Sequence, residues 1–566
     1  MNSKKSLRSG KVFLVLNRIS NHLLNILALL NILMFSIGRN KLEQFELHLY
    51  TTVIFCVIAF FWLTRIFCVG KRFSIINMIP DLVFVGVGIF VTNAEEVFKF
   101  YLISRQTYII IRKQAAPESG KKFLEKLSEN PPILVLYSFL LVIIIGSLLL
   151  LLPSATVKGE ETTLLGAIFT STSATCVTGL IVYDTGTHFT LFGQLIILLL
   201  IQIGGLGIMT ISSAFALMLG QSMSLRSENA IQHMVGESNK IDMTNLIQSI
   251  VIITVSFELI GGGLLFITFS PVMESTAKAI YHSLFHSISA FCNAGFSLYA
   301  NSFMSYRSSF NINFVITSLI IIGGIGFPVL VDIKKIIVLK LNVSRFSLHS
   351  KVVLTSTIIL ILLGTAAFFI SEYDFEMNQM NLKEKLFSSY FQSVTCRTAG
   401  FNTIDNTRLS KGSILMTIIL MFIGASPGST GGGLKTTTFA IIFVAVVSLF
   451  RRNRDVNVFQ RKVSNEIIRR VMALIALSAS VLTVMIFLLL LLEPFSIEQI
   501  VFEAFSAFGT VGLSMGITPL LSGLGQAIII LLMYLGRVGL LTLIFALSSS
   551  SQTVHFSYTE EKIAVG

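Results

Sequence analysis

Four short segments of small and polar residues, each containing a glycine, have the residue types best suited to ion chemistry in this chain. They read STSATCVTGL, SISAFCNAGF, YFQSVTCRTAGFNT and FSAFGTVGLS, and each lies between two apolar runs. Because glycine has no Cβ, the backbone beside it can turn its carbonyl oxygens toward a shared axis. Four such segments around one axis would form a ring of carbonyl oxygens, which can replace the hydration shell of a potassium ion.

The glycines recur along the chain at a nearly constant interval of roughly 110 residues, which indicates one structural unit used four times. We predict that the four residues ending at each glycine form a selectivity filter, with K⁺ held by backbone carbonyls at the glycines. They are Cys176, Val177, Thr178 and Gly179; Cys292, Asn293, Ala294 and Gly295; Arg397, Thr398, Ala399 and Gly400; and Gly509, Thr510, Val511 and Gly512.

The composition indicates a membrane protein in contact with the lipid bilayer. Hydrophobic residues make up 53% and charged residues 13% of the chain, whereas about 25% is charged in soluble domains. A net charge of +13 would also fit a nucleic-acid partner. The lysines and arginines lie mainly in short segments between apolar runs, however, which is the pattern of cytoplasmic loops in membrane proteins. We therefore expect no nucleic-acid partner.

The cysteines are Cys56, Cys68, Cys176, Cys292 and Cys396, and no two form a CxxC pair. This spacing predicts neither a disulfide framework nor a zinc site. Three of the thiols precede filter glycines, so a thiolate metal cluster is an alternative. No histidine or carboxylate recurs beside them, as further ligands would require, so we expect them to pack behind the filter.

The apolar runs predict an all-α polytopic membrane protein. In each unit a long run, a short helical run, the glycine segment and a second long run follow one another. The C-terminal end of the short pore helix is the negative pole of its dipole and would favour a cation at the filter. We predict four helix, pore-loop, helix repeats around one pore, at 131–245, 246–350, 351–470 and 471–566, the last ending in a cytoplasmic tail. Their second long helices are predicted near Phe192–Leu219, Ile312–Val331, Ile414–Leu449 and Gly525–Leu547.

Residues 1–130 precede the repeats and hold a basic tail and about four apolar runs, which predict accessory membrane helices. Asp81 with Arg105, Arg112 and Lys113 is faintly similar to a voltage-sensor pair. A sensor needs a regular ladder of charges through the bilayer. The alternative is that these cationic side chains reach the cytoplasmic interface.

The third repeat is interrupted by GASPGSTGGGLKTTT, from Gly424 to Thr438. Its five glycines and one proline cannot continue a lipid-facing helix, because broken turns would leave backbone groups unpaired in hydrocarbon. The segment must line a cavity or be buried in protein, so we predict that it lies in the pore below the filter. A phosphate-binding loop is the alternative, but the Walker spacing is absent. Lys435 would add positive charge near carbonyls or a carboxylate.

Several ionisable residues lie in apolar surroundings. Arg537 stands alone in a predicted span, where an arginine is costly and indicates a functional site. The alternative is a salt bridge within the bundle, and Glu258 or Glu503 could pair with Arg537 or Arg397. His282 and His286 flank the second pore helix without an HExxH motif or a third ligand, so we expect ordinary residues of the outer mouth.

The glycine segments and these interruptions resemble the Trk/Ktr/HKT superfamily of potassium transporters, over about residues 130 to 550. In that family, the interrupted helix holds an intramembrane gating loop, and an arginine in a GR[IVL]GPLT-like motif constricts the pore. The resemblance assigns the constriction to Arg537, in GRVGLLT, although Leu540 stands where proline is usual. The matched gate residues are Gly424, Ala425, Ser426, Gly428, Ser429, Gly431, Gly432 and Gly433, with Lys435 beside them.

The resemblance also implies ion preference and partners. In the family, glycine at all four filter positions goes with potassium, and serine at the first goes with sodium. Family members form homodimers with one pore per chain, controlled by a cytosolic ring of nucleotide-binding regulatory subunits. The basic connector Arg451–Arg470 is then a candidate docking surface, or simply a cytoplasmic anchor of the topology.

Together these features predict a pore-forming subunit for potassium uptake across the plasma (inner) membrane of a bacterium, gated by the loop. The chain is expected to be neither an enzyme nor a carrier of an organic cofactor. Whether Na⁺ is co-transported or only activates stays open. The alternative is a sodium-selective or poorly selective monovalent cation transporter or symporter. A secondary transporter would show inverted repeats, and a pump would carry a nucleotide-hydrolysing domain.

Overall fold

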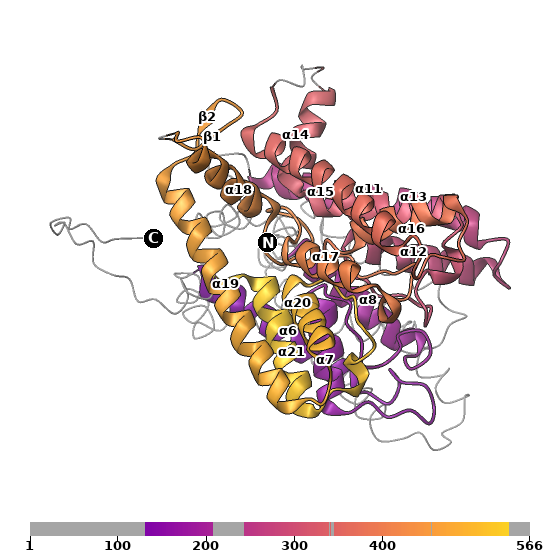
Figure 1. Ribbon diagram of the computed structural model, residues 1–566. Helices are drawn as coiled ribbons and strands as arrows, with labels where there is room; N and C mark the ends of the chain where they lie inside the picture. Colours follow the sequence, from indigo (N-terminus) through magenta and orange to yellow (C-terminus); the bar gives the residue numbers. More distant parts are fainter. Residues whose placement is uncertain are drawn as a thin grey trace, which may run out of the picture.

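The computed structural model describes residues 131–207, 243–338, 340, 345–453, 455–540 and 542. Within these residues the chain is helical except for connecting loops and one two-stranded hairpin of β1 (Asn457–Val458) and β2 (Arg461–Lys462) (Figure 1). The predicted accessory helices of residues 1–130, the voltage-sensor alternative, Cys56 and Cys68 lie outside the described residues.

The helices follow one another in four similar groups, each with a long first helix, a shorter second helix and a further helix after the glycine segment. The first and second groups are α6 (Pro131–Leu150), α7 (Leu164–Thr175) and α8 (Leu191–Leu206), then α11 (Met243–Phe269), α12 (Thr276–Phe291), α13 (Phe310–Ile325) and α14 (Phe327–Val338). The third and fourth are α15 (Leu348–Glu372), α16 (Leu382–Thr395), α17 (Lys411–Phe422) and α18 (Thr436–Phe450), then α19 (Asn465–Leu492), α20 (Ile497–Gly509) and α21 (Gly523–Val538).

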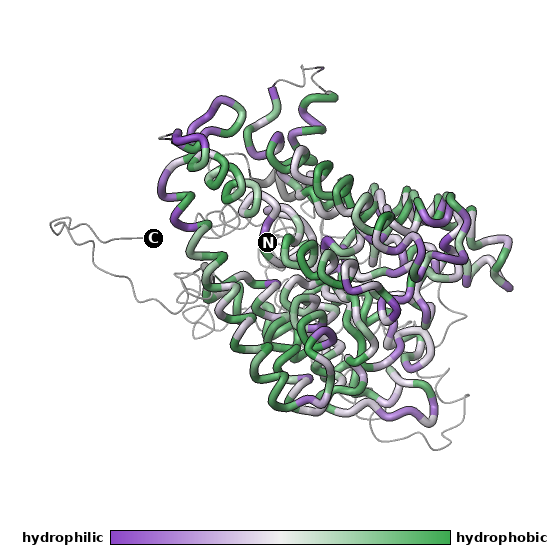
Figure 2. The backbone as a smooth tube through the Cα atoms, in the orientation of Figure 1, coloured by the Kyte–Doolittle hydropathy of each residue, from purple (hydrophilic) through white to green (hydrophobic). Residues whose placement is uncertain are grey.

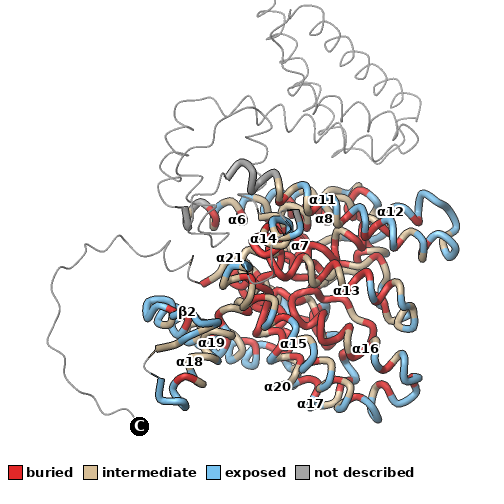
Figure 3. The backbone as a smooth tube through the Cα atoms, turned by 90° about the horizontal axis from the view of Figure 1, so that it is seen from above, coloured by how far each residue is buried: buried red, intermediate tan, exposed pale blue. Residues whose placement is uncertain are grey.

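Three described helices are long and apolar enough to cross a membrane, namely Ser249–Phe269, Leu348–Glu372 and Asn465–Leu492. Hydrophobic residues run along these helices, whereas hydrophilic residues gather at the β1–β2 hairpin (Figure 2). On α19, the side chains of Val484, Phe487 and Leu491 are exposed, as expected for a surface that faces lipid. Buried residues concentrate toward the middle of the bundle, around α7 and α13 (Figure 3).

The short helices α7, α12, α16 and α20 begin at polar caps. The side chains of Thr163, Ser275, Asn381 and Ser496 each accept a hydrogen bond from a backbone N–H of the first turn. Such caps satisfy N–H groups that would otherwise be unpaired. The start of each short helix is thus determined by one residue, and its C-terminal end leads directly into the glycine segment.

Serine–glycine pairs join the first helix to the short helix in three of the four groups. The serine hydroxyl donates to a backbone carbonyl of the first helix, and a glycine on that helix lets the two backbones approach, as in other membrane helix pairs. The bonds run from Ser171 to Ile143 O (2.8 Å), from Ser287 to Glu258 O (2.7 Å) and from Ser393 to Ile361 O (2.9 Å), beside Gly146, Gly261 and Gly364.

The helices after the glycine segments are shorter than the sequence predicted. The prediction placed a break only in the third group, and it was wrong for the second, where α13 ends at Ile325 and α14 leaves at an angle of 100°. The helices α8 and α21 also end at a glycine, Gly207 and Gly539. Gly207, Gly326 and Gly539 have φ values of 81°, 93° and 87°, which strain any other residue, so each glycine can end its helix.

Replacing Gly261 with valine tests the serine–glycine contact. A Cβ at Gly261 would lie 2.6 Å from Ser287 Oγ, so we expect Gly261→Val to lower stability by about 1–3 kcal/mol. The matched control is Gly263→Val on the same helix, because a Cβ there meets no atom within 4 Å. Thermal unfolding of the purified variants in detergent measures the difference. Equal midpoints would contradict the role of the close approach.

Candidate ion pore

The four predicted filter glycines lie against one another in a closed ring. A Cβ placed on any of them would collide with the carbonyl oxygen of the residue before the next glycine. Such a Cβ would approach Ala294 O from Gly179 (2.4 Å), Ala399 O from Gly295 (2.7 Å), Val511 O from Gly400 (2.4 Å) and Thr178 O from Gly512 (2.2 Å). The four segments, far apart in the sequence, therefore meet at one point, where only glycine fits.

The four segments share one backbone path. The glycines have φ between 71° and 91°, and the residue two positions earlier is also left-handed in every segment. Those earlier residues are Val177, Asn293, Thr398 and Thr510, with φ of 57°, 59°, 75° and 51°. Left-handed backbone is costly for branched side chains and persists only where the surrounding structure holds it, so the shared conformation indicates a functional constraint.

Hydrogen bonds to the end of the short helix hold each segment. The N–H of the residue before the glycine donates to a carbonyl of the short helix in all four groups, from Thr178 to Ser173 (2.8 Å), Ala294 to Ser289 (2.8 Å), Ala399 to Thr395 (3.0 Å) and Val511 to Ser506 (2.8 Å). The backbone N–H groups before the glycines are thus already bonded to the preceding short helix. The carbonyl oxygens of the same four residues lie at the glycine ring, where they are available to a cation.

The three described thiols are buried at the C-terminal ends of the short helices. Cys176, Cys292 and Cys396 are fully buried and follow the C-terminal residues of α7, α12 and α16. The Cys292 Sγ lies 3.6 Å from Gln202 Oε1 and 4.0 Å from Glu258 Oε1. Within the described ranges, no group of three His, Cys, Asp or Glu residues could hold a metal ion.

The interrupted segment of the third group is largely buried and bonds to the broken ends of the other helices. Its backbone N–H groups donate to carbonyls that the breaks leave without helical partners. These bonds run from Ser426 to Gly324 O (3.0 Å), from Thr430 to Gly323 O (3.3 Å) and from Gly433 to Gly536 O (3.2 Å). The segment thereby joins the ends of α13 and α21.

The same segment lies against two of the predicted filter residues, Thr398 and Thr510. A Cβ on Gly431 would lie 2.2 Å from Thr398 Oγ1, and the Gly432 N–H donates to Thr510 Oγ1 at 3.0 Å. The Lys435 Nζ donates to Gly431 O at 2.8 Å, so carbonyls are its partners. The small residues found in the sequence are therefore needed for the segment to approach the ring.

Arg537 connects the interrupted segment to the first group. Its guanidinium donates to Thr430 O, to Gly204 O and, at 3.5 Å, to Gly205 O. The charged Arg537 side chain thus donates to carbonyls at the end of α8 and to one carbonyl of the interrupted segment. The α8 break lies in IGGLG, a motif whose glycines also permit close helix packing.

The salt bridges considered for the two arginines are not formed. Arg397 donates weakly to Thr357, at 3.4–3.5 Å, and Arg537 donates to carbonyls. Within the described part of the chain, neither arginine is paired with Glu258 or Glu503. The alternative of such a pair is therefore not realised, because backbone carbonyls, which carry no sequence signal, supply most of the acceptors.

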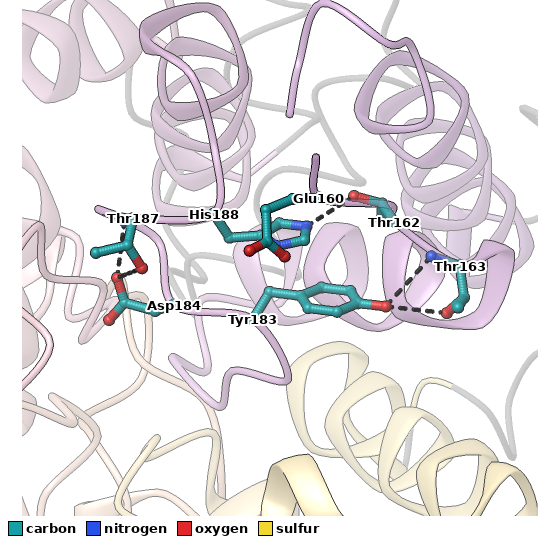
Figure 4. A network of polar contacts seen from close by, with 7 residues as sticks. All are labelled: Glu160, Thr162, Thr163, Tyr183, Asp184, Thr187 and His188. Atoms are coloured by element: carbon teal, nitrogen blue, oxygen red, sulfur yellow. Dashed lines mark hydrogen bonds and ion pairs between the residues drawn. The ribbon is translucent and has the colours of Figure 1, made fainter. Parts of the chain in front are cut away.

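A polar network links the two loops that flank α7 and its glycine segment (Figure 4). His188 is buried between Glu160, at 3.2 Å from its Nδ1, and Thr162, at 3.0 Å from its Nε2, and it stacks on Tyr183. The Tyr183 hydroxyl in turn bonds to Thr163, the cap of α7. The loop after the first segment is thus tied to the start of its own short helix, an arrangement that sequence reasoning missed.

Comparisons with known proteins agree with this geometry. Residues 152–555 match the TrkH family of cation transport proteins. The chain is 41% identical over 439 residues to the Ktr system potassium uptake protein B of Bacillus subtilis, covering 77% of this chain and 97% of that protein. It is 36% identical over 444 residues to the potassium/sodium uptake protein NtpJ of Enterococcus hirae, with coverage of 77% and 97%.

The fold matches the crystal structure of the potassium transporter TrkH from Vibrio parahaemolyticus. The TM-score is 0.61 at 18% identity, over 89% of this chain and 99% of that one. The chain therefore belongs to the Trk/Ktr family of potassium transporters, which are multi-pass proteins of the plasma membrane and not enzymes.

Proposed function

We propose that the chain is the pore-forming subunit of a potassium uptake system and that K⁺ crosses the membrane through the glycine ring. The observation that carries this proposal is the closure of the ring, in which four carbonyl oxygens lie at four mutually touching glycines. The C-terminal ends of α7, α12, α16 and α20 precede the ring, so the negative poles of four helix dipoles favour a cation there.

The ion preference follows from the number of carbonyl rings. Each of the four glycine segments contributes one glycine, whereas each TVGYG segment of a potassium-channel filter contributes two. Fewer rigid rings imply weaker discrimination against sodium. One relative is named as a potassium/sodium uptake protein, which supports a part for Na⁺ as a second transported or activating ion. A sodium-selective or poorly selective transporter is the alternative, and the ratio of rubidium to sodium flux separates the two.

The four helix groups act as four repeats around one pore, at 131–245, 246–350, 351–470 and 471–566. Their common order of long helix, short helix, glycine segment and further helix supports this division. The glycine segments also contact each other in sequence order, the fourth closing on the first. Repeats that run in parallel around a fixed axis favour a channel-like mechanism over alternating access between inverted halves.

The segment Gly424–Lys435 is the gate of this pore. It lies against Thr398 and Thr510 beneath two filter strands, and Arg537 bonds it to the break after α8. Hydrogen bonds to charged groups contribute about 1.5–3 kcal/mol each. The Arg537 bonds therefore stabilise the closed position, and the positive charge of Arg537 also opposes cation entry. Opening of the pore requires the segment to break its contacts with Arg537, Thr398 and Thr510.

Regulation comes from partners. We expect two chains to form a homodimer and a cytosolic ring of nucleotide-binding subunits to control the gate. The connector Arg451–Arg470 contains the β1–β2 hairpin and the first residues of α19, and α18 joins the hairpin to the gate segment. A partner that binds the hairpin could thus act on the gate through one helix. Anchoring of the topology alone is the other role for this basic connector.

Replacing Gly512 with alanine tests the filter. The residue has φ of 87°, and a Cβ would lie 2.2 Å from Thr178 O, so we expect Gly512→Ala to abolish the preference for rubidium over sodium. The matched control is Gly516→Ala, with φ of 84° but with Thr407 Cγ2 at 3.5 Å as its nearest neighbour. Uptake of both ions into liposomes measures the ratio. A filter role is excluded if both variants keep the ratio of the unchanged protein.

Replacing Arg537 with glutamine tests the gate. The change removes the charged donor to Thr430 O and Gly204 O, so we expect faster rubidium uptake into liposomes, by about tenfold or more. Shortening the segment between Gly424 and Gly433 should raise uptake in the same way. Arg408→Gln, at an exposed arginine, is the control. Unchanged or slower uptake in both gate variants would argue against a gate at this segment.

A further inference from the structure

Two residues of different chemistry occupy the same place beside the filter. His286 on α12 and Glu503 on α20 stand at the same distance along the chain before Gly295 and Gly512. Both are fully buried, with 0% and 1% exposure. The sequence predicted ordinary outer-mouth residues at His282 and His286, and the structure shows that His286 is enclosed by protein.

The two side chains contact the same pair of groups, a backbone N–H and a serine hydroxyl, in the segment that follows each filter glycine. The Leu298 N–H donates to His286 Nε2 at 3.2 Å, and Ser297 Oγ lies 3.2 Å from the same nitrogen. In the fourth repeat, the Met515 N–H donates to Glu503 Oε1 at 3.2 Å, and Ser514 Oγ donates to the same oxygen. The serines occupy matching positions, as do Leu298 and Met515.

Further contacts fix the orientation of both acceptors. His286 must be neutral with its proton on Nδ1, because Nε2 accepts from Leu298 and Nδ1 lies 2.7 Å from His282 O. The imidazole stacks on Tyr299 with ring centroids 4.9 Å apart. Glu503 Oε2 accepts from Thr518 Oγ1 at 3.0 Å. Neither acceptor can turn away from its strand without losing several bonds.

The other two repeats lack this acceptor. Thr170 and Phe391 stand at the corresponding positions before Gly179 and Gly400, and Thr170 Oγ1 has no hydrogen-bond partner among the described residues. Each glycine touches its sequence neighbours in the ring, so the second and fourth repeats face each other across it. The buried acceptor at this position therefore holds the segments of the second and fourth repeats only, on opposite sides of the ring.

We propose that His286 and Glu503 are positioning residues that hold two opposing filter strands apart and thereby set the preference for potassium over sodium. This inference rests on the proposed function of the glycine ring. Sodium is the smaller ion, so a ring favours it only when its carbonyls can move inward. Hydrogen bonds that anchor the strands just beyond Gly295 and Gly512 oppose that movement.

The test separates the hydrogen-bond acceptor from packing and charge. His286→Phe and Glu503→Leu remove the acceptor and keep most of the volume, whereas His286→Gln and Glu503→Gln keep an acceptor oxygen. We expect the ratio of rubidium to sodium uptake into liposomes to fall by about threefold to tenfold in the first pair and by less than about twofold in the second. The controls are His282→Gln and Glu498→Gln, on the same two helices.

A ratio of two fluxes does not depend on the fraction of folded protein, so partial misfolding leaves the outcome readable. An unchanged ratio in His286→Phe and Glu503→Leu overturns the inference. An equal loss in Glu503→Gln and Glu503→Leu overturns it as well, since charge would then be the property that matters. The absence of rubidium preference in the unchanged protein would instead count against the proposed function.

Discussion

The close approach of four glycines and four carbonyl oxygens is the contact on which the rest of the structure depends. Any Cβ at Gly179, Gly295, Gly400 or Gly512 would lie 2.7 Å or less from a neighbouring carbonyl oxygen. The surrounding elements bring these backbones together. Short capped helices end at the ring, and serine hydroxyls bond three of them to their first helices. The glycine ring can therefore form only when the helices are packed in this way.

The helix breaks beneath the ring set a second constraint, because each leaves carbonyl groups that hydrocarbon cannot satisfy. The segment Gly424–Lys435 and Arg537 supply the missing donors. Ser426 and Thr430 bond to the break after α13, Gly433 bonds to the end of α21, and Arg537 bonds to the end of α8. The segment that we propose as the gate thus also satisfies the broken helices, so its observed position is stabilised by hydrogen bonds to three helix ends.

The meeting of the four glycine segments could be predicted from the sequence because glycine, spacing and flanking hydrophobicity are all local signals. The partners of Arg537 and Lys435 could not, since they are backbone carbonyls of segments that are distant in sequence. The break after α13 was missed because IGGIG also fits an unbroken, closely packed helix. His286 and Glu503 stand at matching positions in the sequence, but their shared role as acceptors becomes visible only in their geometry, because histidine and glutamate differ in chemistry.

Locating bound rubidium tests the central claim most directly. Anomalous diffraction from crystals grown in rubidium salt would reveal the ion positions in the folded protein. The account predicts a peak on the axis of the ring, within coordination distance of the carbonyl oxygens of Thr178, Ala294, Ala399 and Val511. Ordered rubidium elsewhere in the bundle, with the ring empty, would contradict the claim that these four strands form the filter.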